Sequence, residues 1–334
     1  MCLYPRLIRN RKYVPNKKNG GIVPEVKDKR VLSVPVGCGK CLECKKQKSR
    51  EWQVRLQEDI RANQNAKFVT FTFSEHELEK LESEIKLEGY DRDNEVCRIA
   101  VRRFTERWRK QYKKTIRHWL VTELGSQNTE RVHMHGLLWT DEPTAVIQEK
   151  WKYGKIWIGE YVNGKTISYI VKYINKVDKA HKEYNSKIFT SKGIGGNYMQ
   201  RKDIERNKYR EGKTIETYKT REGIELALPI YYRNHIYSDS EKELLWLEKL
   251  DKEVRYVDGV KVSISQDEEE YYKLLGVKRQ KSKRLGYGDD AINWDMKNYE
   301  NERRNLIKLD RMKKKYGLND DDERLISLKN LIEN

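Results

Sequence analysis

Two histidines separated by one residue, His133 and His135, stand in the segment VHMHGLLW. If this segment is a β-strand, side chains two residues apart point to the same face, so both imidazoles aim at one point. On a helix the same spacing would separate them. Because imidazole nitrogens bind divalent metal ions, the pair predicts a metal site. The alternative is two histidines on a strand surface.

Glu123, in the segment IRHWLVTELG, is the candidate third ligand. This segment, residues 116–125, alternates in polarity and is followed by the short polar loop GSQNTER, so it predicts a strand paired with 132–139 in a hairpin. Glu123 would then lie opposite the histidines. Two imidazoles and one carboxylate can hold Mg²⁺ or Mn²⁺ and leave positions open for a phosphate oxygen. A solvated glutamate is the alternative.

A pair of tyrosines, Tyr169 and Tyr173, stands in the segment ISYIVKYINK, residues 167–176. Four apolar residues at helical spacing predict an amphipathic helix that buries one face: Ile167, Ile170, Val171 and Ile174. The tyrosines lie one turn apart on the other face. Ordinary packing along a surface is one interpretation of this pair.

The chemical interpretation is that Tyr169 and Tyr173 are nucleophiles. A nearby cation favours the phenolate, and attack on a DNA phosphate would leave a covalent phosphotyrosine and a free 3′-hydroxyl. With two tyrosines, one can hold a cleaved 5′ end while the other cuts the next copy. Lys172 and Lys176 are expected to bind the DNA backbone, and Lys172 also to assist the phenolate.

Three cysteines stand close together in CGKCLEC, namely Cys38, Cys41 and Cys44. This spacing suits thiolate ligation, and Cys2 could complete a tetrahedral structural Zn²⁺ site if the N-terminus folds back. Free thiols are the alternative. An odd total of five cysteines argues against a disulfide framework and for a reducing compartment.

The composition favours a polyanionic partner. The 334 residues carry a formal net charge of +18, and the basic residues are spread along the chain. A positive field of this kind attracts nucleic acid. No apolar run approaches the roughly 20 residues needed to span a bilayer, and the basic N-terminus lacks the apolar core of a secretory signal. We therefore expect no membrane partner.

The elements that must position these residues alternate between strands and helices. From residue 67 to 176 the patterns predict a strand, two helices, two strands, a helix, a strand and a helix. The fold class is therefore α+β, with a central antiparallel sheet flanked by helices. We expect three parts: a basic, irregular segment with the cysteines (1–62), the core (63–180) and a charged C-terminal extension that contacts DNA or partners (181–334).

Outside the core the patterns are weaker. A helix is expected over residues 45–63, a strand within 225–238, and charged helices over 239–255 and 294–333.

Taken together, three motifs resemble the HUH endonuclease superfamily: FVTFTF, HMHGLLW and YIVKYINK. Five further segments look like the replication initiators of the gokushovirus branch of the Microviridae, which are single-stranded-DNA bacteriophages: MCLYPRLI, CGKCLECKKQKSREW, ELGSQNTERVHMHGLLW, SKGIGG and LPIYYRN. The resemblance covers about residues 1–240. It departs from the family at Leu124, where the superfamily has an aromatic residue between the acidic ligand and glycine.

The resemblance implies that His133, His135 and Glu123 hold the metal ion and that Tyr169 and Tyr173 nick and rejoin DNA. It implies a rolling-circle replication initiator in the host bacterial cytoplasm that nicks the origin of a circular duplex. Host helicase, single-strand-binding protein and polymerase are the expected partners. Two alternatives stay open: a plasmid-type or transposase-like nuclease, and a basic, zinc-containing nucleic-acid-binding protein without catalysis.

Overall fold

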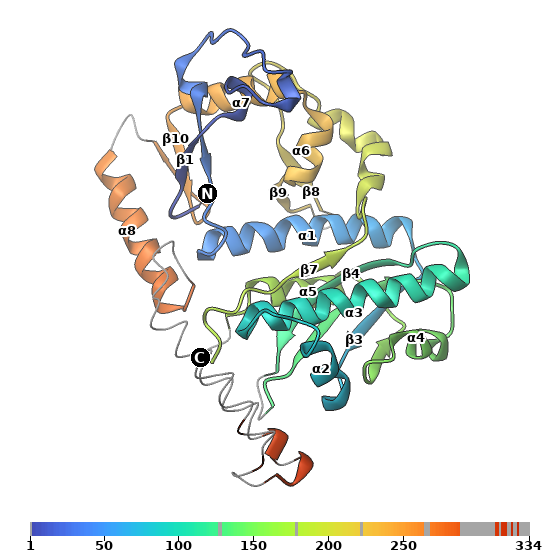
Figure 1. Ribbon diagram of the computed structural model, residues 1–334. Coiled ribbons are helices and arrows are strands. Elements are labelled where there is room, and N and C mark those ends of the chain that lie inside the picture. Colours follow the sequence, from blue (N-terminus) through green and yellow to red (C-terminus); the bar gives the residue numbers. More distant parts are fainter. Residues whose placement is uncertain are drawn as a thin grey trace. The chain divides into compact units, whose positions relative to one another are not determined.

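The computed structural model of the chain describes residues 2–125, 129–177, 180–220, 223–263 and 268–287, with a few positions between 311 and 326 (Figure 1). Its described residues divide into two compact units. The first unit combines residues up to 58 with those from 195 to 291, and the second combines 59–194 with 292–334. Neither unit coincides with one of the three consecutive segments of the sequence analysis, because the N-terminal segment shares a unit with residues after 195.

A five-stranded antiparallel sheet forms the centre of the second unit, with the strand order β6-β3-β5-β4-β7. Its strands are β3 (Ala66–Phe71), β4 (Arg117–Leu124), β5 (Val132–Trp139), β6 (Ile156–Gly159) and β7 (Ile188–Thr190). The expected α+β class with a central antiparallel sheet is confirmed. The short edge strand β7 was not predicted from the sequence.

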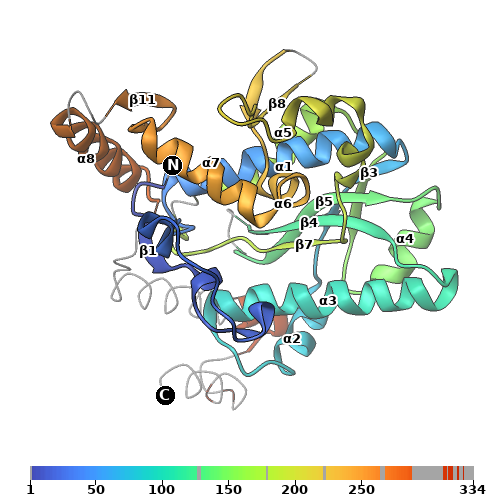
Figure 2. The same ribbon diagram turned by 90° about the horizontal axis from the view of Figure 1, so that it is seen from above.

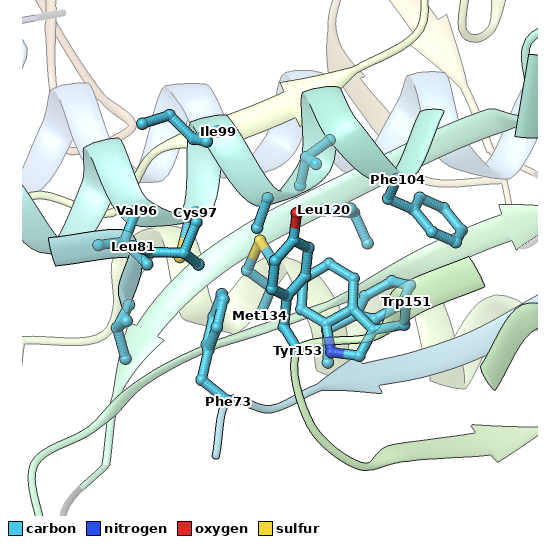
Figure 3. Close-up of a cluster of buried hydrophobic side chains, with 14 of the residues drawn as sticks. Phe73, Leu81, Val96, Cys97, Ile99, Phe104, Leu120, Met134, Trp151 and Tyr153 are labelled. Atoms are coloured by element: carbon cyan, nitrogen blue, oxygen red, sulfur yellow. The ribbon is translucent and has the colours of Figure 1, made fainter. Parts of the chain in front are cut away.

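Three helices cover one face of this sheet: α2 (Glu75–Glu82), α3 (Gly89–Tyr112) and α4 (Thr144–Trp151). Figure 3 shows α3 lying across the strands, with Cys97 and Phe104 pointing toward the sheet. Trp151 of α4 packs on Phe71 of β3, with ring centroids 4.3 Å apart. This face is the main hydrophobic core of the unit, which large aromatic side chains fill despite the polar composition.

The other face of the sheet carries α5 (Gly164–Asn175), opposite to α3 (Figure 2). Asn163 and Thr166 form a capping box that begins this helix. Four apolar side chains of α5 are buried, as the spacing predicts: Ile167, Ile170, Val171 and Ile174. The predicted order of strands and helices, from β3 to α5, is confirmed.

Gly136 lies at the centre of β5, where the neighbouring strand comes too close for any side chain. A Cβ atom there would lie 2.0 Å from the carbonyl oxygen of Trp119. Relief of such an overlap requires the strands to separate, so we expect Gly136→Ala to lower the free energy of unfolding by about 2–4 kcal/mol. Chemical denaturation measures this loss. Gly164→Ala is the matched control, because a Cβ there meets no atom within 4 Å, and an unchanged stability of Gly136→Ala would contradict the predicted overlap.

The first unit is built from short elements around the first part of α1 (Leu42–Ala62). Three hairpin-like pairs lie in it: β1 (Arg6–Arg9) with β2 (Ser33–Val36), β8 (Thr217–Lys219) with β9 (Glu225–Ala227), and β10 (Val254–Val257) with β11 (Val260–Ser263). Its other α-helices are α6 (Ile230–Ile236), α7 (Asp239–Asp251) and α8 (Glu268–Arg284). Short 3-10 helices complete it: Arg11–Tyr13, Lys17–Asn19, Lys29–Leu32, Gly196–Gln200 and Lys202–Asn207.

The expected strand within residues 225–238 is wrong for most of its length. Only Glu225–Ala227 is extended, and Pro229 begins the helix α6, with its carbonyl oxygen accepting a hydrogen bond from the Arg233 N–H. Proline favours the start of a helix because it has no N–H to donate. Tyr232 of α6 is fully buried and stacks on Tyr198 with ring centroids 4.7 Å apart.

The expected helix over 239–255 ends earlier, at Asp251, and β10 follows. The expected helix over 294–333 lies largely outside the described residues. Within the described part of the chain, no helix combines the length and apolar character required to cross a membrane.

Candidate active site

The hairpin of β4 and β5 brings the three candidate metal ligands to one point on the α5 face of the sheet. Glu123 is the register partner of His133, and Val121 is the partner of His135. Because strand side chains alternate between faces, all four side chains project to the same side. Burial alternates accordingly along this part of β5: Met134 is buried in the core beneath α3, whereas both histidines are partly accessible.

The ligand atoms of these residues converge. One carboxylate oxygen of Glu123, Oε2, lies 3.2 Å from Nε2 of His133 and 3.0 Å from Nε2 of His135. The ligand atoms of the three residues all lie within 4.8 Å of one another. The sequence-based placement of Glu123 opposite the histidines is therefore confirmed as geometry, and the group could hold a metal ion.

The outer nitrogens of the imidazoles explain why this arrangement suits a metal ion. Nδ1 of His133 lies 3.3 Å from the carbonyl oxygen of Arg131, which can only accept, so Nδ1 carries the proton. In the neutral ring, Nε2 then presents a lone pair toward a carboxylate oxygen. Two lone pairs repel unless a cation lies between them, as it does in a metal site with this second shell of hydrogen bonds. Nδ1 of His135 is likewise held, 3.0 Å from Oγ1 of Thr70.

The electrostatics keep the three groups in the protonation states that metal binding requires. Burial alone would raise the pKa of Glu123, but hydrogen bonds from His133, His135 and Lys176 outweigh it and hold the pKa well below 4.5. Burial lowers the pKa of His135 below 6.5, and the positive charges of His133 and Lys176 lower it further against the opposing effect of Glu123. An ionised carboxylate and a neutral imidazole are both metal ligands at neutral pH.

The helix α5 places both candidate nucleophiles beside this group. The Tyr173 ring stacks on the His135 ring, with centroids 4.3 Å apart and an interplanar angle of 9°. The Tyr173 hydroxyl donates a hydrogen bond of 2.6 Å to the Tyr169 hydroxyl. Tyr169 is 49% exposed, and its ring lies 6.1 Å from that of Phe68 on β3. The expected face of α5 is therefore confirmed, and both phenolic oxygens lie on the side of the ligand group.

In the absence of a cation, Tyr173 is a poor nucleophile. Burial raises its pKa above the usual value of 10.0, and the hydrogen bond with Tyr169 and the negative charge of Glu123 add to this effect. Its reaction with a phosphate therefore needs positive charge close to the phenolic oxygen.

Of the two candidate DNA-binding lysines, Lys176 lies at the site. Its ammonium group contacts the second carboxylate oxygen of Glu123 and lies 5.9 Å from the centre of the Tyr173 ring. Lys172 is exposed on α5, and its role stays a prediction.

A pocket of about 590 Å³ opens next to the histidines, at the ends of β3 and β5. Besides His133 and His135, its lining includes Thr70, Arg131 and Lys155. These residues, and Trp157 on β6, were not singled out from the sequence. Trp157 is 61% exposed, and its ring lies 5.4 Å from that of Phe68. Strand alternation places Thr70 on the same face as His135, but only the register of β3 against β5 identifies it as a partner.

The fold and the site together define a class: an antiparallel α+β sheet that carries a two-histidine, one-glutamate group beside a tyrosine pair. Residues 66–178, roughly a third of the chain, match the model of a family described as replication-associated protein ORF2. The match begins at β3 and ends just after α5, so it contains every residue of the candidate site. It indicates a role in DNA replication and is consistent with a rolling-circle initiator. Searches of curated proteins and of solved structures found no match.

Proposed function

We propose that the protein is a rolling-circle replication initiator that nicks and rejoins single-stranded DNA at the origin of a circular duplex. One observation carries this proposal: the tyrosine pair of α5 lies against the His133, His135 and Glu123 group. Structural packing alone explains neither an ionised carboxylate shared by two imidazoles nor two adjacent phenolic hydroxyls on a partly exposed helix face. The family match over the same residues supports the assignment to replication.

His133, His135 and Glu123 would hold a Mg²⁺ or Mn²⁺ ion, since both metals accept mixed oxygen and imidazole ligands. When bound, such an ion supplies positive charge that polarises the scissile phosphate and favours the phenolate. Lys176 adds a second cation on the same side, and the exposed Lys172 extends the basic surface of α5. Both are proposed to bind phosphates that flank the scissile one.

The proposed reaction is a transesterification. The phenolic oxygen of one tyrosine attacks the phosphorus atom and loses its proton, while the bond from phosphorus to the 3′ oxygen breaks. The 3′ oxygen takes up a proton and leaves as a free hydroxyl, from which a polymerase can extend. The 5′ end remains linked to the tyrosine, and attack by a later 3′-hydroxyl reverses the reaction and closes a circle. The second tyrosine can cut the next copy while the first is occupied.

The surroundings of the site suit an unpaired strand. Trp157, Phe68 and Tyr169 place three aromatic rings side by side, and exposed aromatic rings stack on unpaired bases regardless of sequence. The pocket beside the histidines, lined by Arg131 and Lys155, offers a polar path for the backbone.

The chain's resemblance to gokushovirus initiators extends the proposal to a bacteriophage protein that acts in the host bacterial cytoplasm. Its DNA would be the viral origin, as supercoiled duplex and as displaced strand. Host helicase, polymerase and single-strand-binding protein would supply the remaining steps.

Incubation of the protein with supercoiled circular DNA that contains the origin, plus Mg²⁺ or Mn²⁺, tests the function. We expect nicked circles with protein attached to the 5′ end of the nick, detected as slow migration in detergent that protease treatment reverses. Chelation of the metal should prevent nicking. A basic, non-catalytic binding protein would instead retard the DNA in a salt-sensitive and chelator-insensitive manner, without breaking a strand.

A further inference from the structure

Four cysteines of the first unit form a second group of potential metal ligands. Their sulfur atoms all lie within 4.8 Å of one another. Sγ of Cys2 lies 3.9 Å from Sγ of Cys41, and Sγ of Cys38 lies 4.0 Å from Sγ of Cys44. A disulfide requires about 2.05 Å, and none of the five cysteines, all within the described residues, is in one. The group belongs to a different unit from the candidate active site and plays no part in the chemistry proposed above.

The sulfur separations match the edges of a tetrahedron around a zinc ion. With zinc–sulfur bonds of about 2.3 Å, tetrahedral geometry places the sulfur atoms about 3.8 Å apart. The ligand spacing has the same character, since Cys38 and Cys41 flank a tight turn. Gly39 in that turn has a φ of 77°, a left-handed conformation that favours glycine.

Backbone N–H groups point at the sulfur atoms, as expected if these carry negative charge. The N–H groups of Tyr4 and Cys38 donate to Sγ of Cys2 over 3.3 and 3.2 Å, and the N–H of Cys41 donates to Sγ of Cys38 over 3.3 Å. The N–H of Leu3 lies 3.5 Å from Sγ of Cys41. Neutral thiols are weak acceptors, whereas thiolates accept such bonds well. Four thiolates at these distances repel one another unless a cation joins them.

The chain around the cysteines is shaped to bring them together. A Cβ atom on Gly37 would lie 3.1 Å from Sγ of Cys44, so glycine allows the loop to approach the sulfur. Cys44 lies in the first turn of α1, where the helix dipole favours a negative charge. Leu3 is buried with Cys41 in a small apolar cluster that includes Val257 and Leu275.

We propose that Cys2, Cys38, Cys41 and Cys44 bind one structural Zn²⁺ ion as thiolates. The ion fixes residues 2–4 to the start of α1 and closes the apolar cluster beneath α8. The Leu3 carbonyl oxygen accepts a hydrogen bond of 2.8 Å from Nε of Arg279 on α8, so the anchored segment also holds that helix. All four coordination positions are filled by protein, which makes the site structural and not catalytic. Because metal and fold form together, loss of the ion destabilises the first unit.

Zinc content of the full-length protein, purified under reducing conditions without chelator, tests this proposal. We expect about one zinc ion per chain by mass spectrometry of the metal, and near zero for Cys41→Ser or Cys44→Ser. Cys97→Ala, which changes a buried cysteine of α3, and the pair His133→Ala with His135→Ala should keep the ion. Zinc that is absent from the wild type, or lost with the histidines and kept in the serine variants, would overturn the proposal.

X-ray absorption spectroscopy of the wild-type zinc protein provides a test that does not depend on the folding of a variant. Four sulfur neighbours at about 2.3 Å support the site. A first shell that contains nitrogen or oxygen, with fewer than four sulfur atoms, contradicts it. Iron in place of zinc would overturn the identity of the ion, because an iron tetrathiolate has the same geometry but absorbs visible light.

Discussion

Replacement of Tyr169 and Tyr173 together by phenylalanine is expected to abolish the covalent protein–DNA adduct. Each change removes only the hydroxyl group, so the stacking of ring 173 on His135 and the contact of ring 169 with Phe68 remain. The lost hydrogen bond between the hydroxyls should cost no more than about 1 kcal/mol of stability. We expect adduct formation on supercoiled origin DNA to fall by at least about 10³-fold, because no nucleophile remains.

The single variants separate the two roles of the pair. Tyr169→Phe and Tyr173→Phe should each retain one nucleophile and therefore a single cleavage, but should fail to convert displaced strands into closed circles. Tyr161→Phe is the matched control, since Tyr161 is 81% exposed and lies outside the site. Metal binding should be the same in all four proteins. Adducts that persist in the double variant would show that neither tyrosine is the nucleophile.

The site could be predicted from the sequence because its geometry follows from local periodicity. The His-x-His spacing requires a strand, and the position of Glu123 before a short hairpin loop requires it to face that strand, so the register Glu123 to His133 follows almost directly. The tyrosine face of α5 follows from the four buried residues on its opposite side. Each of these inferences depends on residues no more than about ten positions apart, or on one helix.

What the sequence did not predict depends on contacts between distant segments. Thr70 supports His135 only because β3 pairs with β5 in a particular register, and alternation alone cannot fix the register of non-adjacent strands. The compact first unit joins residues before 58 to those after 195, which no local pattern indicates. Residues 225–238 have the aromatic composition of a strand, but Pro229 and the burial of Tyr232 favour a helix there.

The metal ligands should prove as essential as the tyrosines. The combined change His133→Ala and His135→Ala removes two of three ligands and leaves the Glu123 carboxylate in contact with Lys176. We expect Mn²⁺ binding, measured by the paramagnetic resonance signal of the free ion, to disappear, and nicking to fall by at least about 10³-fold. His76→Ala is the matched control, because the His76 side chain is 75% exposed on α2. DNA retardation at low salt should persist, since it depends on the overall charge of +18.

Thr70→Val distinguishes a metal site from a catalytic histidine pair without a metal. Valine has nearly the shape of threonine but cannot hydrogen-bond with Nδ1 of His135, which lies 3.0 Å from the hydroxyl oxygen. Loss of such a second-shell partner weakens metal affinity by about 10–100-fold. We therefore expect Thr70→Val to need more Mn²⁺ for half-maximal nicking and to regain the full rate at saturation, whereas the double histidine variant stays inactive at every concentration. If nicking by the wild type is unaffected by chelators, and Thr70→Val lowers the rate equally at all Mn²⁺ concentrations, the three residues do not act through a metal ion.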